Sequence, residues 1–364
     1  MDPVTHLMTG AVLARAGFNR KAAYATVAMT LAAEAPDLDV LWSLGGPVAA
    51  FQHYRGWTHT FLGLQFEAAL VVAVIYLFHQ WRERRATTLP ASRSQPLTKP
   101  PVAPVRWGLL WLFSLIALAS HLLLDYTNNY GLRPLAPFDP HWHSASIVFI
   151  IEPVILLLLL LALVAPSLFG LINSEVGARR YPFRGRGWAI FALTAIVALW
   201  SFRWYQHARA EQLAYAEDYG AEVLNVDANP LPINPFEWHV VVETPLFYQL
   251  VTVNTFTGAI ATSQQADVFY KPPTTLATLA AKRSWLGEVY LDWARIPLVT
   301  ETATPLQDDV FVPGSTALVT FRDLRFFYDT AFLSGRSHPP LSGSVTVDQD
   351  RKVVRMEMNG SVQR

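Results

Sequence analysis

The pattern of apolar and polar positions divides the chain into a first part with long apolar runs and a second part with short alternating runs. The runs at about 60–81, 107–125 and 145–169 are long enough to cross a bilayer as helices, which takes about 20 residues. A fourth run, 188–205, is shorter but still fits a span. The pattern therefore predicts about four membrane-spanning helices within residues 1–204.

Two shorter apolar stretches precede these spans. Residues 4–16 and 21–35 have a helical pattern, but each is only about 14 residues long, or about 21 Å at the rise of an α-helix. Residues 17–19 between them have the composition of a turn. The sequence therefore predicts a short antiparallel helix hairpin, which brings His6 and Asp37 to the same end of the helices.

A different pattern follows the last apolar run. Alternating stretches at 238–243, 247–254 and 344–347 are separated by Pro, Gly, Asn and Asp, which is typical of antiparallel strands. The remaining length of about 160 residues is ample for a separate soluble domain. The predicted fold class is α+β, with a polytopic helical membrane domain (1–204) followed by a β-rich domain (205–364).

The composition agrees with a membrane protein. Of the 364 residues, 52% are hydrophobic and only 15% are charged, and the mean hydropathy is +0.25. Basic and acidic residues number 28 each, so no excess of charge indicates a nucleic-acid partner. The chain has no cysteine, which excludes disulfides and thiolate ligands, so that any metal site has to use His and carboxylate ligands.

Basic residues are concentrated in two loops between the predicted spans. Residues 82–106 and 170–187 are rich in Arg and contain few acidic residues, which indicates the cytoplasmic side of a membrane. The loops 36–58 and 126–144 then face outward, as does the β-rich domain. We therefore expect a multi-pass membrane protein with its C-terminal domain on the outer side.

Under this topology, His and carboxylate residues from separate segments lie at the outer ends of the helices. His121 and Asp125 are four residues apart, so they project from one helix face and can bind the same ion or adjacent ions. Mixed imidazole and carboxylate ligands suit Zn²⁺, Mn²⁺ or Fe²⁺ better than Ca²⁺ or Mg²⁺. The sequence predicts one or two divalent ions, with Zn²⁺ or Mn²⁺ expected, and these ligands: His6, Asp37, Asp39, His53, His59, His121 and Asp125.

A site of this kind points to hydrolysis. Bound metal generates hydroxide near neutral pH and orients a phosphoryl or acyl group. Arg55 is the candidate to neutralise a developing oxyanion, and Asp39 is the candidate proton shuttle. Because the site would open at the depth of lipid headgroups, we expect hydrolysis of an ester or phosphoester in a lipid-like substrate. Membrane lipid and this substrate are the expected partners, no nucleic acid is expected, and protein partners are undefined.

Several motifs resemble a known family. They are the early His6, Pro-Asp-x-Asp at 36–39, Arg-Gly-x-Thr-His-Thr at 55–60, and His-x-x-x-Asp at 121–125 followed by Tyr-Gly and prolines. In these motifs, roughly the first 200 residues resemble the YdjM-like family of bacterial inner-membrane proteins, which are described as membrane-bound metal-dependent hydrolases. The resemblance implies a bacterial inner membrane, with the C-terminal domain on the periplasmic side. It implies a metal site more than any particular reaction. One position departs from the family pattern, because Tyr54 precedes the arginine where the family usually has His, and His53 lies one place earlier.

Other interpretations of the same residues stay open. His59 and His121 can be histidines that hydrogen-bond between helices, and Asp37 and Asp39 can lie in a solvated turn. Two other functions also fit, namely a non-catalytic envelope scaffold with a structural metal and an ion-coupled transporter. The transporter is less consistent with the pattern, because an ion path should be lined by polar residues throughout and these lie on one side only.

Overall fold

The computed structural model describes residues 1–88, 103–175, 184–261, 267–302, 315–328 and 339–363. The chain divides into two compact units, the first formed by residues 1–38 and 55–204 and the second by residues 39–54 and 205–364. Each unit has hydrophobic clusters of its own. The middle parts of the two basic loops, 89–102 and 176–183, lie outside the described residues.

The first unit is helical. Its elements are α1 (Pro3–Arg15), η1 (Phe18–Arg20), α2 (Ala25–Glu34), η3 (Trp57–His59), α4 (Phe61–Thr88), α5 (Trp107–Thr127), α6 (Pro153–Glu175) and the first part of α7 (Arg186–Ala216). Within the described ranges, three helices are long and apolar enough to cross a membrane, namely Phe61–Ala86, Trp107–Thr127 and Arg186–Ala216. A shorter apolar helix, Pro153–Phe169, lies in α6. The prediction of a helical part with apolar spans is confirmed.

Helix α6 begins later than the apolar pattern predicted. The run from residue 145 predicts a helix throughout, but residues 145–152 are not helical. The Ala145 N–H donates to the Tyr126 carbonyl at 2.7 Å, and the Val148 N–H donates to the Thr127 carbonyl at 3.0 Å. Pro153 then provides the first helical position, where its missing N–H costs nothing.

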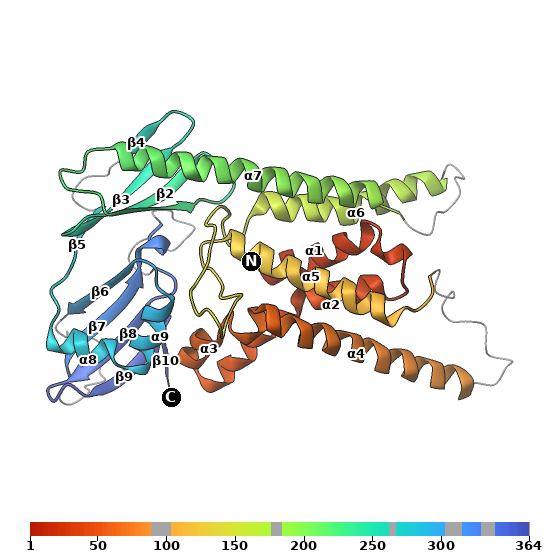
Figure 1. Ribbon diagram of the computed structural model, residues 1–364, viewed down its shortest axis with the longest axis horizontal. Coiled ribbons are helices and arrows are strands. Elements are labelled where there is room, and N and C mark those ends of the chain that lie inside the picture. Colours follow the sequence, from red (N-terminus) through yellow and green to blue (C-terminus); the bar gives the residue numbers. More distant parts are fainter. Residues whose placement is uncertain (89–102, 176–183, 262–266, 303–314, 329–338, 364) are drawn as a thin grey trace. The chain divides into compact units, whose positions relative to one another are not determined.

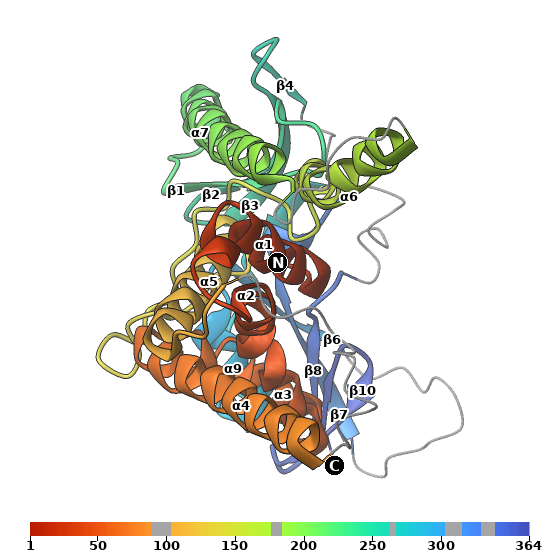
Figure 2. The ribbon, with the colours of Figure 1, turned by 90° about the vertical axis from the view of Figure 1, so that its right-hand side faces the viewer.

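The two short helices α1 and α2 form the predicted hairpin and lie beside α5 (Figure 1). Helix α1 contacts both α5 and α6 and lies between them (Figure 2). A Cβ atom added to Gly10 would come within 2.4 Å of the Met29 carbonyl oxygen and 2.8 Å of the Ala33 Cβ, so the two backbones are in close contact there. This contact fixes the start of α1, which carries His6, beside the end of α2.

A buried ion pair connects the residue before α6 to α7. Arg203 Nη2 lies 3.0 Å from Glu152 Oε2, and the two side chains are 1% and 0% exposed. Charged groups among apolar helices are costly unless they are paired. Glu152, which directly precedes α6, therefore has a partner on α7.

The second unit contains two antiparallel sheets and confirms the predicted β-rich part. The strands are β1 (Asn225–Pro230), β2 (Glu237–Glu243), β3 (Phe247–Asn254), β4 (Ala259–Ala261), β5 (Val268–Tyr270), β6 (Pro297–Thr302), β7 (Ser315–Asp323), β8 (Gly343–Asp348), β9 (Val353–Met358) and β10 (Ser361–Val362). One sheet has the order β1-β2-β3-β4 with β5 also paired to β3, and the other has the order β10-β9-β8-β7-β6. The three alternating stretches of the sequence became β2, β3 and β8.

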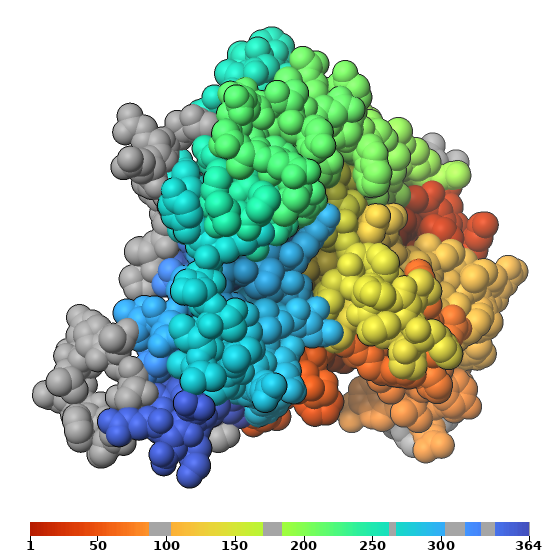
Figure 3. Space-filling view, turned by 60° about the vertical axis from the view of Figure 1, so that its left-hand side comes forward, coloured from red at the N-terminus to blue at the C-terminus, as the bar shows by residue number. Residues whose placement is uncertain are grey.

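Helical elements cover parts of these sheets. The C-terminal part of α7 packs Ala210 and Ala214 against Trp238 of the first sheet. The alternating pattern did not predict α8 (Leu276–Lys282) and α9 (Trp285–Trp293), which pack on the second sheet and are seen in cyan in Figure 3. A short turn, η6 (Leu324–Phe326), follows β7.

Residues 39–54 belong to the second unit, although the predicted division at residue 204 placed them in the first domain. They contain most of η2 (Ala35–Gly45) and all of α3 (Pro47–His53). Phe51 packs edge-on against Trp293 with ring centroids 5.1 Å apart, and the Trp285 indole N–H donates to Gln52 Oε1 at 2.9 Å. These contacts with α9 explain why a stretch expected to be a loop is a helical part of the other unit.

Candidate metal centre

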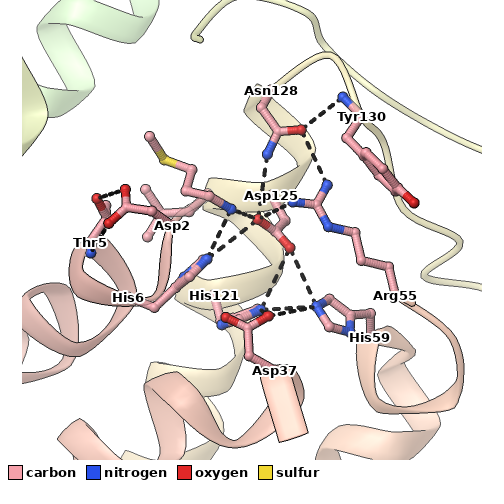
Figure 4. Close-up of polar contacts among 12 residues, drawn as sticks. Asp2, Thr5, His6, Asp37, Arg55, His59, His121, Asp125, Asn128 and Tyr130 are labelled. Atoms are coloured by element: carbon pink, nitrogen blue, oxygen red, sulfur yellow. Dashed lines mark hydrogen bonds and ion pairs between the residues drawn. The ribbon is translucent and has the colours of Figure 1, made fainter. Parts of the chain in front are cut away.

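Five of the seven predicted ligands meet in the first unit (Figure 4). We call them the His/Asp cluster, and they are His6 of α1, Asp37 after α2, His59 of η3, and His121 and Asp125 of α5. All but Asp37 are 0% exposed. Their ligand atoms form two groups within 4.8 Å, one of His6, Asp37 and His121 and the other of His59, His121 and Asp125. Segments distant in sequence thus bring imidazole and carboxylate groups together.

The orientation of His121 is set by the end of α2. His121 Nδ1 lies 2.8 Å from the carbonyl oxygen of Ala33. A carbonyl only accepts hydrogen bonds, so Nδ1 carries the ring proton and Nε2 presents a lone pair. The carbonyl is available because the last turn of a helix leaves its carbonyl groups without helical partners. His121 Nε2 lies 3.0 Å from His59 Nε2, so two ligand-type nitrogens face each other.

The polar turn before α4 positions His59. Thr60 Oγ1 accepts from the Gly63 N–H at 2.9 Å and donates to the Trp57 carbonyl at 2.8 Å, which fixes the start of the helix. His59 Nδ1 lies 3.0 Å from Thr58 Oγ1. Burial, and next the imidazole of His121, keeps the pKa of His59 well below its usual value. His59 is therefore neutral near pH 7, which is the form that binds metal ions.

Asp125 is held by Arg55 and the loop after α5. Arg55 Nη2 donates to Asp125 Oδ1 at 2.8 Å, while Nη1 donates to Asn128 Oδ1 at 3.2 Å and to the Gly131 carbonyl at 2.9 Å. The Asn128 amide also donates to Asp125 Oδ1 at 3.4 Å. With Oδ1 engaged in this way, Oδ2 lies 3.4 Å from His59 Nε2 and 3.6 Å from His121 Nε2.

Asp37 completes a set of four donor atoms. Its Oδ1 lies 3.7 Å from His59 Nε2 and 3.8 Å from His121 Nε2. Its Oδ2 is buried and has no hydrogen-bond partner among the described residues, and burial raises the pKa of this carboxyl group. In a tetrahedral site with metal–ligand bonds of about 2.0–2.1 Å, neighbouring ligand atoms lie about 3.3 Å apart. The spacings of His59 and His121 Nε2 from each other and from each of the two carboxylate oxygens are close to this value, and Asp37 and Asp125 fall in different groups of neighbouring ligand atoms.

The N-terminal amino group lies beside these donors. The N-terminal ammonium group of Met1 forms an ion pair with Asp125 Oδ1 and lies 3.0 Å from His6 Nε2. Met1 is 3% exposed, and burial lowers the pKa of its amino group well below the usual value. The His6 ring stacks on the ring of His121 with centroids 3.7 Å apart. The amino group of Met1 therefore lies among the same side chains, and its burial favours the neutral amine.

The other two predicted ligands belong to the second unit. Asp39 is 4% exposed, and the His53 ring stacks on Trp42 with centroids 4.0 Å apart. Neither appears in the two groups of neighbouring ligand atoms found among the described residues. The ligand roles of Asp39 and His53, and the role of Asp39 in proton transfer, stay predictions.

Sequence reasoning missed three contributors to this site. They are the Met1 ammonium group, the Asn128 side chain, and Tyr130, whose N–H donates to Asn128 Oδ1 at 2.9 Å and whose ring lies 4.8 Å from the Arg55 guanidinium. The position of Asn128, one helical turn after Asp125, is a signal in the sequence. The contacts of Met1 and Tyr130 depend on which distant segments pack together, and no local pattern in the sequence shows this.

Comparisons with known proteins agree with this picture. The family model described as YdjM inner membrane protein matches residues 1–210. The chain belongs to this family. It is 26% identical over 163 residues to the uncharacterized protein YfhP of Bacillus subtilis (strain 168), and the match covers 43% of each of the two chains. No solved structure matches. YdjM membership, together with the apolar helices, makes this a membrane protein, and the family match ends near the C-terminal end of α7.

Proposed function

We propose that this protein is a metal-dependent hydrolase of the inner membrane that acts on an ester or phosphoester, with lipids as its substrate class. This proposal is supported mainly by two imidazole nitrogens that lie 3.0 Å apart, each of which is 3.4 to 3.8 Å from an oxygen of Asp37 and an oxygen of Asp125. When bound, a divalent cation, for which Zn²⁺ and Mn²⁺ are the expected candidates, supplies a Lewis acid that polarises the substrate oxygen and lowers the pKa of water.

The residues of the site have separate tasks in this proposal. His59, His121, Asp37 and Asp125 provide ligand atoms for one ion, and His6 is available for the same or a second ion. The Asp37 side chain is 14% exposed, whereas His59 and His121 are 0% exposed, so the substrate approaches from the side of Asp37.

Arg55 has a supporting task. The sequence suggested that it neutralises an oxyanion, but its Nη1 and Nη2 donate to Asn128, Gly131 and Asp125. These bonds support a positioning role, in which Arg55 engages one oxygen of Asp125 and leaves the other for the ion. Asp39 remains the proposed proton shuttle.

A hydrolysis assay tests the proposal. We would measure the turnover of phospholipids and of a generic phosphoester by purified protein in lipid nanodiscs, before and after chelation and after Zn²⁺ or Mn²⁺ is restored. Chelation, His59→Gln and Asp125→Asn should each lower turnover at least about 100-fold, because each removes a ligand or the ion itself. His141→Gln is the matched control, since this loop side chain is 81% exposed, and it should keep full activity. Turnover that survives both chelation and His59→Gln would contradict the mechanism.

A structural metal is the second candidate. The complete burial of His6, His59, His121 and Asp125 favours it, because structural sites are closed and catalytic sites keep an open position. In that case, chelation lowers the thermal unfolding midpoint and no substrate is turned over. The hydrolase proposal instead expects turnover that is lost on chelation and restored by metal.

The proposed topology has several spans, with the second unit on the periplasmic side. It is supported by the basic loops at 82–106 and 170–187. Because the chain has no cysteine, single cysteines report accessibility without background. Asp350→Cys, in the exposed turn after β8, should react with a membrane-impermeant maleimide in intact spheroplasts, and Glu83→Cys should react only after lysis. The reverse pattern would overturn the orientation.

A further inference from the structure

The segment between α2 and α4 carries an exposed apolar patch. Val40 and Leu41 are each 61% exposed, Trp42 is 52% exposed and Leu44 is 89% exposed. We call Val40–Leu44 the apolar tip. The sequence from Val40 to Gln52 contains no Asp, Glu, Lys or Arg. A patch of large exposed apolar side chains without charges is unfavourable in water and usually marks an interaction surface.

The residues that follow the apolar tip are fixed to the C-terminal part of their own unit. Gln363 Nε2 donates to the Gly45 carbonyl at 3.0 Å, and Gln363 Oε1 accepts from the Val48 N–H at 2.9 Å. Within the tip, the Trp42 ring stacks on His53. The tip therefore projects from a packed base, and its exposed side chains form a defined surface.

Both ends of the segment are connected to the membrane part of the chain. Asp37 in the His/Asp cluster precedes it, and Phe61 at the start of the α4 span follows it. Phe61 and Phe66 are 54% and 66% exposed on that span, where lipid is the natural surrounding. Leu44 is seven residues after Asp37, so the chain restricts it to about 25 Å from that residue, at about 3.6 Å per residue. The chain thus keeps the tip within about 25 Å of Asp37.

We propose that the apolar tip inserts into the bilayer at the end of the helices that carries the His/Asp cluster. Trp42 suits the headgroup level, where amphipathic indole rings concentrate, and Leu44 reaches the acyl chains. Burying these side chains in lipid removes their apolar surface from water. The connection of this segment to the α4 span through the chain, and its lack of charge, favour lipid over another protein chain. This insertion is independent of the proposed hydrolysis, so each can fail without the other.

Spin labelling of the full-length protein tests the insertion, again using the absence of cysteine. Leu44→Cys and Leu41→Cys would be labelled in nanodiscs of phosphatidylethanolamine and phosphatidylglycerol, and collisions with oxygen and with a water-soluble nickel chelate would be measured. Phe66→Cys on α4 is the reference in lipid, and Asp350→Cys in the exposed turn after β8 is the reference in water. Because Leu44 is almost fully exposed, its replacement leaves the fold intact.

We expect both labels on the tip to resemble the Phe66 label. At each of them, the ratio of oxygen collisions to nickel collisions should exceed the ratio at Asp350 by at least about 5-fold, because oxygen concentrates in the bilayer interior and the nickel chelate does not enter it. A ratio equal to that of Asp350 means that the tip lies in water and overturns the proposal. Low access to both reagents means that the tip is covered by protein, which also overturns it.

Discussion

Arg55 and Asp125 form a buried ion pair, in which Arg55 Nη2 donates to Asp125 Oδ1 at 2.8 Å and each side chain is 1% exposed. The guanidinium is itself fixed by Asn128 and the Gly131 carbonyl. The pair therefore decides which oxygen of Asp125 is turned towards His59 and His121. It also offsets the unfavourable position of a carboxylate near the C-terminal end of α5, where the helix dipole is negative.

We expect Arg55→Gln to destabilise the protein by about 3 kcal/mol, because removing one partner of a buried pair leaves the other charge without compensation. The double variant Arg55→Gln/Asp125→Asn removes both charges and should recover part of that loss. Thermal unfolding midpoints in one detergent, together with bound metal measured by elemental analysis, check this expectation. Strictly additive effects of the two substitutions would show that the residues are not coupled.

The same variants separate positioning from general stability. Arg55→Lys keeps the positive charge but loses the planar arrangement of donors that reaches Asp125, Asn128 and Gly131 together. We expect Arg55→Lys to retain most of the stability and to lower metal affinity. Wild-type metal affinity in Arg55→Lys would contradict the positioning role.

Gly10→Ala should disturb the His/Asp cluster from a distance. A methyl group at Gly10 would lie 2.4 Å from the Met29 carbonyl oxygen, so α1 has to move away from α2. The cost should be about 1–3 kcal/mol, and metal binding should weaken because these helices carry His6 and lead into Asp37. Gly108→Ala is the matched control, since a methyl group there meets nothing within 4 Å. If the two variants have the same thermal unfolding midpoint and the same metal content, the close contact at Gly10 does not position the His/Asp cluster.

Much of the cluster was predictable because its signals are local. The four-residue spacing of His121 and Asp125 places them on one helix face, and the proline after α2 places Asp37 at a helix end. The position of α6 was predicted less well, since residues 145–148 are apolar but form hydrogen bonds to Tyr126 and Thr127 instead of a helix. Apolar composition alone does not distinguish a buried extended segment from a span.

Other features depend on contacts between distant segments and leave no local trace. Arg55 has the residue type expected of an anion-binding group, and only the path of the loop at 128–131 shows that its guanidinium is directed at Asp125. The assignment of residues 39–54 to the second unit likewise depends on Phe51 meeting Trp293. Neither contact has a periodicity that a single sequence displays.

Phe51→Ala should loosen α3 from the second unit. The Phe51 ring lies 5.8 Å from Tyr290 and 5.1 Å from Trp293 between centroids, and its removal should cost about 1–3 kcal/mol through lost burial and ring contacts. We expect faster proteolysis within residues 39–54 and unchanged metal content. Leu246→Ala, at a position that is 72% exposed, is the control and should behave as wild type. Proteolysis at the wild-type rate would show that Phe51 does not anchor α3.

For the proposed metal site, the donor set also predicts the selectivity. Two imidazole nitrogens and two carboxylate oxygens favour Zn²⁺ or Mn²⁺ over Mg²⁺ and Ca²⁺, because the latter prefer sites made of oxygen ligands alone. After a chelator has removed bound metal, calorimetry should still detect Zn²⁺ binding in an about 100-fold excess of Mg²⁺, because imidazole ligands suit Zn²⁺ better than Mg²⁺. His59→Glu replaces one nitrogen by a carboxylate and should shift the preference from Zn²⁺ towards Mn²⁺, while His141→Glu, in the exposed loop, should not. If both substitutions leave the selectivity unchanged, His59 is not a ligand and the ion lies elsewhere.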